Sequence, residues 1–131
     1  MNYRPLTKDE EKVAQAITYA ALTVHKELGP GLLEKVYETC MAYLLIQSKF
    51  DVKQNFEVPI IFKGKRMDAG LKTNLVVNDT AIVEIKAADE NADVWEKQMF
   101  SFLKLTGIKV GIIINFNNPN MSRNGIKKFV L

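Results

Sequence analysis

Apolar residues recur at helical spacing in the first third of the chain, and this pattern predicts two helices. From Val13 to Leu28 they return every three or four positions. Thr7-Lys8-Asp9-Glu10 stands before them and matches the Ser/Thr-x-x-Glu capping box of a helix N-terminus. Gly29-Pro30-Gly31 ends this helix, because glycine accepts positive φ and proline cannot continue the hydrogen-bond ladder. A second apolar stripe predicts a helix from about Leu32 to Ser48.

The pattern then becomes typical of β-strands. Residues 56–62 are rich in β-favouring side chains, and Pro59 within them indicates an edge strand or a bulge. Lys63-Gly64-Lys65 is a turn. The runs 71–77 and 81–87 flank Asn78-Asp79-Thr80, which predicts a hairpin.

The last third of the chain predicts one more helix and a buried strand. The helix covers roughly residues 93–105, and the almost wholly apolar run 110–115 is typical of a strand covered on both faces. A loop over 117–125 and a short strand over 126–131 follow. With no repeat and no linker, residues 1–131 predict a single α/β domain, with a mixed sheet of four to five strands flanked by helices in the order ααβββαβ(β).

Composition excludes several classes of protein and selects none. Hydrophobic residues make up 47% and charged residues 25%, which excludes a disordered or collagen-like chain. The net charge of +3 suits a nucleic-acid partner and an average protein equally. The single cysteine, Cys40, predicts a buried free thiol and a reducing cytoplasm. No apolar run approaches the ~20 residues that span a bilayer, so we expect no membrane partner.

Charged residues inside a β-rich segment give the first chemical signal. In residues 81–87, Glu84 and Lys86 share one face of the strand with Ile82. An ion pair on an exposed sheet face is the simpler interpretation. The functional interpretation is a metal-binding carboxylate beside a lysine that positions a nucleophilic water.

Two helices carry further candidates. Glu34 and Tyr37 are three positions apart on the second helix, and Gln98 and Phe102 are four apart on the third. Taken singly, Gln98 is typical of a surface amide and Glu34 of a solvated flank.

Taken together, these segments resemble one known family. Gly29-Pro30-Gly31-Leu32-Leu33-Glu34-Lys35-Val36-Tyr37 resembles the signature of the GxxExxY proteins, which belong to the PD-(D/E)XK nuclease superfamily. The resemblance continues through residues 82–87, 98–107, 111–116 and 125–128, so it covers about residues 24–131. It implies a restriction-endonuclease-like or RecB-like core.

The resemblance also implies a site. It assigns Glu84 and Lys86 to the (D/E)XK pair, Glu34 to the helical acid and Gln98 to the glutamine, with Phe102 where tyrosine is common. Mg²⁺ or Mn²⁺ would be held by Glu84, Glu34 and the residue ten positions before Glu84. That residue is Asn74, where the family has aspartate. An amide oxygen brings no charge to a Mg²⁺ site, so the sequence predicts weakened metal binding.

The hairpin register tests this assignment. Asn74 and Glu84 lie opposite each other only if Val77 pairs with Ala81, which requires an odd-length loop such as Asn78-Asp79-Thr80, or a bulge. We predict this loop. We also expect His25 to be structural or exposed. Lys63, Lys65, Arg66 and Lys72 form a modest basic patch that could contact phosphate, although a solvated face is the commoner explanation.

These residues are compatible with three functions. The first is metal-dependent cleavage of DNA or RNA phosphodiesters, which retained Glu34, Glu84, Lys86 and Gln98 favour. The second is a pseudo-nuclease that binds nucleic acid or a protein without cutting, which Asn74 favours. The third is a dimerisation module, in which a homodimer forms through an apolar surface left exposed by helix packing.

Overall fold

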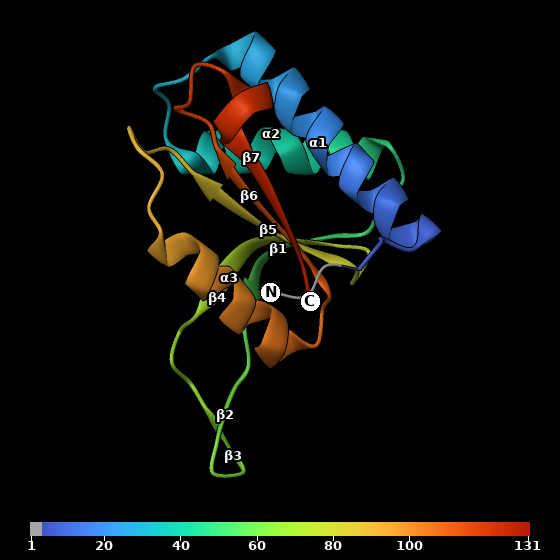
Figure 1. Cartoon of the computed structure of the whole chain (residues 1–131), viewed down its shortest axis with the longest axis vertical. Helices are drawn as coiled ribbons and strands as arrows, with labels where there is room; N and C mark the ends of the chain where they lie inside the picture. The colour runs from blue at the N-terminus through green and yellow to red at the C-terminus, as the bar shows by residue number, and fades with distance from the viewer. Residues whose placement is uncertain (1–3) are drawn as a thin grey trace.

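A five-stranded mixed sheet forms the centre of the structure, with helices on both faces (Figure 1). The structure is a computed structural model that describes residues 4–131. The strand order is β1-β4-β5-β6-β7, with β5 and β6 parallel and the other neighbours antiparallel. The strands are β1 Val52–Glu57, β4 Lys72–Val77, β5 Ala81–Lys86, β6 Val110–Asn115 and β7 Ile126–Val130. This architecture confirms the predicted α/β fold with its mixed sheet and flanking helices.

The two N-terminal helices cover one face of the sheet. Helix α1 spans Lys8–Leu28 and begins with the predicted capping box, in which Thr7 Oγ1 accepts from the Glu10 N–H at 3.1 Å. Helix α2 spans Glu34–Gln47. It begins two residues later than predicted because Leu33 is extended, with φ −75° and ψ 149°.

The turn between α1 and α2 is held by a tyrosine. The Tyr37 hydroxyl donates to Gly29 O at 2.6 Å and accepts from the Leu32 N–H at 3.0 Å. Its ring is fully buried and stacks on Phe116, with the ring centroids 4.2 Å apart. Gly31 adopts φ +101°, which favours glycine. The turn is therefore fixed by buried contacts.

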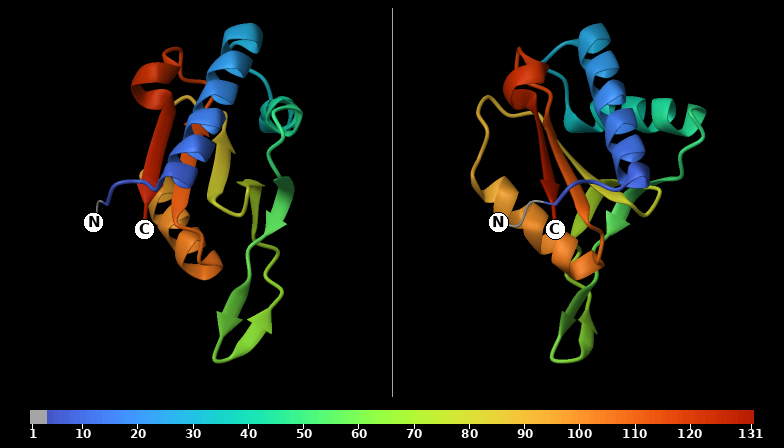
Figure 2. Two further views of the ribbon diagram at one scale, coloured as in Figure 1. Left: turned by 90° about the vertical axis from the view of Figure 1, so that its right-hand side faces the viewer. Right: turned by 45° about the vertical axis from the view of Figure 1, so that its right-hand side comes forward.

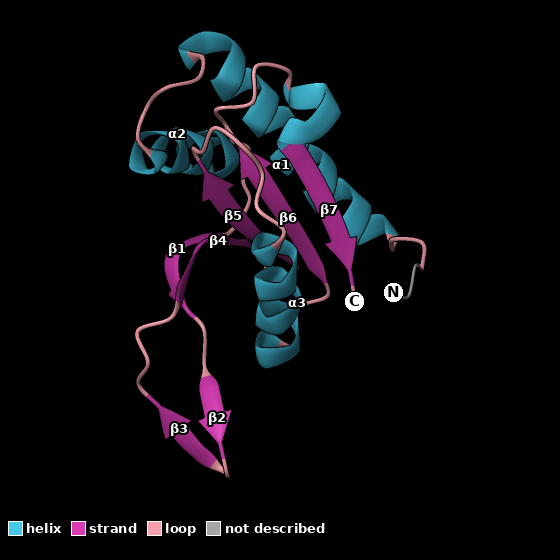
Figure 3. Cartoon of the chain, turned by 60° about the vertical axis from the view of Figure 1, so that its left-hand side comes forward, coloured by secondary structure: helices cyan, strands magenta, loops and turns pink. Residues whose placement is uncertain are grey.

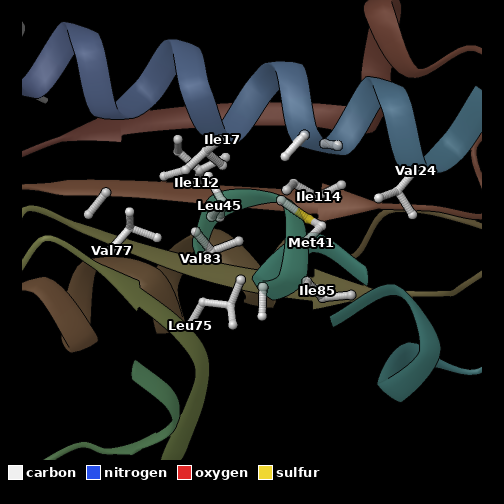
Figure 4. Packing of buried hydrophobic residues seen from close by; sticks show 14 of the residues in the cluster. Ile17, Val24, Met41, Leu45, Leu75, Val77, Val83, Ile85, Ile112 and Ile114 are labelled. Atoms are coloured by element: carbon white, nitrogen blue, oxygen red, sulfur yellow. The ribbon is translucent and has the colours of Figure 1, made fainter. Parts of the chain in front are cut away.

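Helix α3, Val94–Thr106, packs on the opposite face (Figure 3). It supplies the crossover that parallel strands β5 and β6 require. Side chains pointing to α1 and α2 form the larger core, and Figure 4 shows Ile17, Met41 and Val83 meeting there. Met99, Phe102 and Leu103 of α3 meet the other face of the sheet in a second core. The sheet is thus apolar on both sides, as the buried run at 110–115 predicts.

A two-stranded ribbon extends from the sheet (Figures 1 and 2). Pro59 divides the predicted run 56–62 between β1 and β2, which spans Ile60–Phe62, and β2 pairs with β3, Lys65–Met67. The break falls here because Val58 donates its N–H to Leu71 O and Pro59 has no N–H to continue the ladder. We call residues 58–67 the arm.

The β4–β5 hairpin has the predicted register. Val77 pairs with Ala81 and Leu75 with Val83, across the loop Asn78-Asp79-Thr80. The predicted C-terminal strand is also present as β7, and a π-helical turn, η1 Met121–Gly125, precedes it within the predicted loop. None of the helices within residues 4–131 has the length and apolarity to cross a membrane.

Candidate functional site

Glu84 lies in a cleft between strands β4 and β5 and the middle of α3. The Glu84 residue is 8% exposed. Its Oε2 accepts from Thr73 Oγ1 at 2.9 Å and from the Asn74 N–H at 3.3 Å, and its Oε1 has no donor among residues 4–131. The cleft, of about 440 Å³, is lined by Leu71, Lys72, Glu84, Lys97, Gln98, Ser101 and Phe102. One carboxylate oxygen is thus available to a ligand in the cleft.

The electrostatics of Glu84 reflect its burial. Desolvation is the largest effect and raises the pKa of the Glu84 carboxyl above its ordinary value. The nearby Lys86 charge and the two hydrogen bonds lower that pKa, and the Glu34 charge raises it further. Lys86 itself lies over Trp95, with Nζ 5.5 Å from the ring centroid. Glu84 and Lys86 therefore interact, but through space and without a direct ion pair.

Strands β4 and β5 separate at Asn74. The paired residues end at Leu75 and Val83, and beyond them the Asn74 side chain occupies the place of the next backbone contacts. Asn74 Oδ1 accepts from the Ile85 N–H at 2.8 Å. Its Nδ2 donates to Glu38 Oε1 at 2.8 Å, so the side chain turns toward α2 while Glu84 faces α3. The register brings Asn74 and Glu84 together, but their contact is made by the Asn74 backbone.

Glu38 is a buried acid that sequence reasoning missed. It is 2% exposed and accepts from Asn74 Nδ2, from Lys35 Nζ at 3.0 Å and from Gln54 Nε2 at 3.3 Å. Its signal in the sequence is position: it is three and four residues before Met41 and Ala42, on the buried side of α2. This acid, and not Glu34, is hydrogen-bonded to Asn74.

Glu34 occupies the first turn of α2, where it is exposed. Its side chain makes no hydrogen bond or ion pair with another residue of the described chain 4–131, and acts on Glu84 only through its charge. The structure therefore does not bring Glu34 into contact with Asn74 or Glu84. Its assignment as a metal ligand stays a prediction.

The other predicted residues divide into two groups. Gln98 and Phe102 line the Glu84 cleft, Gln98 as an exposed amide and Phe102 as a buried part of its wall. Tyr37 lies in the core, bound to the turn that follows α1. His25 is half-buried with its ring 6.5 Å from Phe116, and Cys40 is a half-buried free thiol. Neither contributes to the cleft.

The donor set does not form a complete metal site. Within residues 4–131, no group of three or more His, Cys, Asp or Glu side chains is arranged to hold a metal ion. Glu84 offers one oxygen, whereas Asn74 uses its oxygen on Ile85 and its nitrogen on Glu38. Mg²⁺ prefers several oxygen ligands with carboxylates among them. The residues present thus do not fit the two-carboxylate site expected from the resemblance.

The mixed sheet, its flanking helices and the Glu84–Lys86 strand define a restriction-endonuclease-like fold. A family model described as the PD-(D/E)XK nuclease superfamily matches residues 11–129. The chain therefore belongs to this superfamily. No curated protein and no solved structure matches this chain significantly.

Proposed function

We propose that this nuclease-superfamily domain binds DNA or RNA at the Glu84 cleft and that Asn74 impairs phosphodiester hydrolysis there. The observation that carries the proposal is the Asn74 side chain, which is hydrogen-bonded at both ends away from the cleft. A ligand at Glu84 Oε1 would thus meet one carboxylate without a second beside it. The exposed cations Lys72 and Lys97 on the cleft rim suit a phosphate backbone.

An active metal-dependent nuclease is the second candidate. Glu84, Lys86 and Gln98 favour it, since three of the residues that the resemblance implies border one cleft or interact with its acid. A divalent cation in such enzymes activates water and stabilises charge on the phosphate. For this chain, dependence on Mg²⁺ or Mn²⁺ is expected to require a carboxylate at position 74.

One assay separates the two candidates. Fluorescent DNA and RNA of one sequence, single-stranded and duplex, are incubated with wild type, Asn74→Asp, Glu84→Gln and the double variant, in Mg²⁺, Mn²⁺ or EDTA. We expect wild type to bind without cleaving above the level of Glu84→Gln, and Asn74→Asp to gain cleavage that the double variant loses.

The outcomes decide between the candidates. Metal-dependent cleavage by wild type, lost in Glu84→Gln, would make the chain an active nuclease. Binding without cleavage by any variant would support a pseudo-nuclease. Failure of wild type to bind any of the four nucleic acids would overturn the proposal.

We also propose a cytoplasmic location. The lone thiol of Cys40 favours the cytoplasm. Exposed large side chains on α1 and α2 favour a homodimer as the alternative to a monomer. Tyr19 is 73% exposed and Tyr43 is 63% exposed. Sedimentation over a range of concentrations tests it: a constant monomer mass would exclude the dimer.

A further inference from the structure

The arm carries large apolar side chains that are exposed. Ile61 and Phe62 are each 58% exposed, and Met67 is 39% exposed. Among the described residues, the two strands of the arm, β2 and β3, pair only with each other, outside the five-stranded sheet. They project along the longest axis of the molecule (Figures 1 and 2). An exposed group of large apolar side chains on a projecting ribbon marks a contact surface.

The arm also holds the whole net charge of the protein. It contains Lys63, Lys65 and Arg66 and no acidic residue. The chain has 18 Lys and Arg and 15 Asp and Glu, so without these three cations the remaining charges balance. None of the three makes an ion pair within residues 4–131. The arm is therefore a free cationic surface on an otherwise neutral domain.

Strand register places aromatic and cationic groups together at the tip. Phe62 pairs with Lys65, and Ile60 with Met67, so these four share one face, while Ile61 and Arg66 share the other. The connecting residues Lys63 and Gly64 both have positive φ, 51° and 78°, as a two-residue type I′ turn requires. The turn holds the Lys63 side chain at the very end of the arm.

The arm leads directly to the Glu84 cleft. Residues 68–71 connect β3 to β4, and both Leu71 and Lys72 line the cleft. At the base of the arm, the Val58 N–H bonds to Leu71 O. A chain of phosphates could thus follow exposed cations from the tip of the arm to the rim of the cleft.

We propose that the arm binds single-stranded nucleic acid, with Phe62 stacking on a base and Lys63, Lys65 and Arg66 contacting phosphates. The inference rests on the proposed function, which supplies nucleic acid as the partner, and it adds where and in what form the strand is held. Aromatic rings beside cations are the usual means of holding unpaired bases and their backbone. A duplex is less suited, because a ring inserted into it must first unstack a base step.

The test compares two pairs of matched variants. Lys63→Gln/Lys65→Gln/Arg66→Gln removes the arm cations, and its control, Lys8→Gln/Lys26→Gln/Lys49→Gln, removes three exposed cations elsewhere. Phe62→Ala removes the ring, and Tyr43→Ala removes an equally exposed ring on α2. Binding of a fluorescent 20-nucleotide DNA strand, the matching RNA strand and a DNA duplex is measured across a salt series, after circular dichroism confirms folding.

We expect the arm triple variant to lower the slope of log K against log salt by about 2, since each lost phosphate contact removes about 0.7 for a single strand. We expect Phe62→Ala to weaken single-strand binding about tenfold, and both controls to stay near wild type.

The results distinguish the arm from the cleft. If wild type binds nucleic acid and both arm variants bind equally well, the arm inference is overturned while the proposed function stands. If wild type binds no nucleic acid, both fall. A larger loss for duplex than for single strand overturns the assignment of single strands. Binding of wild type, but not of the arm variants, to phosphatidylserine vesicles in place of nucleic acid would overturn the inference and assign the arm to a lipid surface.

Discussion

Asn74 Nδ2 and Glu38 Oε1 are 2.8 Å apart, in a hydrogen bond that ties the central sheet to α2. The donor is a neutral amide and the acceptor a buried carboxylate. The hydrogen bond is stable because the neutral amide does not repel the carboxylate. The identity of residue 74 therefore sets both the local charge and the packing of α2 on the sheet.

Replacement of Asn74 by Asp should destabilise the protein at neutral pH. The new carboxylate faces Glu38 at hydrogen-bond distance and loses the Nδ2 donor, which we expect to cost about 2–3 kcal/mol. Urea unfolding measures the change. The loss should be smaller in Mn²⁺ than in EDTA.

Asn78→Asp is the matched control, because Asn78 is exposed and its Oδ1 accepts from the Asp51 N–H, which a carboxylate can also do. Equal losses for both variants would contradict the role given to Asn74 and Glu38.

The two acids of α2 should respond differently to neutralisation. Glu38→Gln removes a buried charge that accepts from Lys35, Gln54 and Asn74, and we expect it to lower the free energy of unfolding by about 1–3 kcal/mol. Glu34→Gln changes an exposed residue and should stay within about 0.5 kcal/mol of wild type. Thermal and urea unfolding compare them; a larger effect at Glu34 would reverse the assignment.

Glu84 predicts a pH dependence of stability. Because burial raises the pKa of its carboxyl in the folded state, its contribution to stability is complete below the unfolded pKa and is lost as pH rises through the folded one. Glu84→Gln keeps an acceptor for Thr73 and the Asn74 N–H but has no charge. We expect the variant to gain stability relative to wild type as pH rises from 4 to 8.

Urea titrations of both proteins at each pH measure that difference. If the stability of Glu84→Gln relative to wild type stays constant or falls as pH rises, desolvation does not control the pKa of the Glu84 carboxyl.

Tyr37→Phe isolates the hydroxyl that holds the turn after α1. The ring should still stack on Phe116, but Gly29 O and the Leu32 N–H lose their partner, at a cost of about 1–2 kcal/mol. Tyr43→Phe, on the exposed side of α2, serves as control and should be near neutral. Differential scanning calorimetry measures both, and no difference between them would contradict a role for the hydroxyl.

Much of the fold follows from local patterns in the sequence. The capping box at Thr7 set the start of α1, and the odd loop at 78–80 set the register of β4 and β5. Pro59 marked a discontinuity, but the sequence could not tell an edge strand or bulge from a strand that leaves the sheet. That depends on where Val58 and Leu71 meet, which is a contact between residues far apart in the chain.

The site was less predictable, because side-chain direction depends on tertiary packing. The family resemblance assigned Glu34 as the helical acid, yet α2 begins only at that residue and leaves it exposed. Glu38 lies one turn further on, among buried neighbours, where it meets a strand that the helix pattern cannot specify. The grouping of Glu84 with Gln98, by contrast, followed from residues on consecutive elements.

The charged arm affects how the protein is oriented as a partner approaches. The formal excess of three positive charges corresponds to the three arm cations, and the arm projects at one end of the long axis of the molecule (Figure 1). A polyanion within the Debye length, about 8 Å at physiological salt, exerts a torque that turns the arm toward it. The protein would thus meet such a partner tip first, and its orientation would be set before any contact forms.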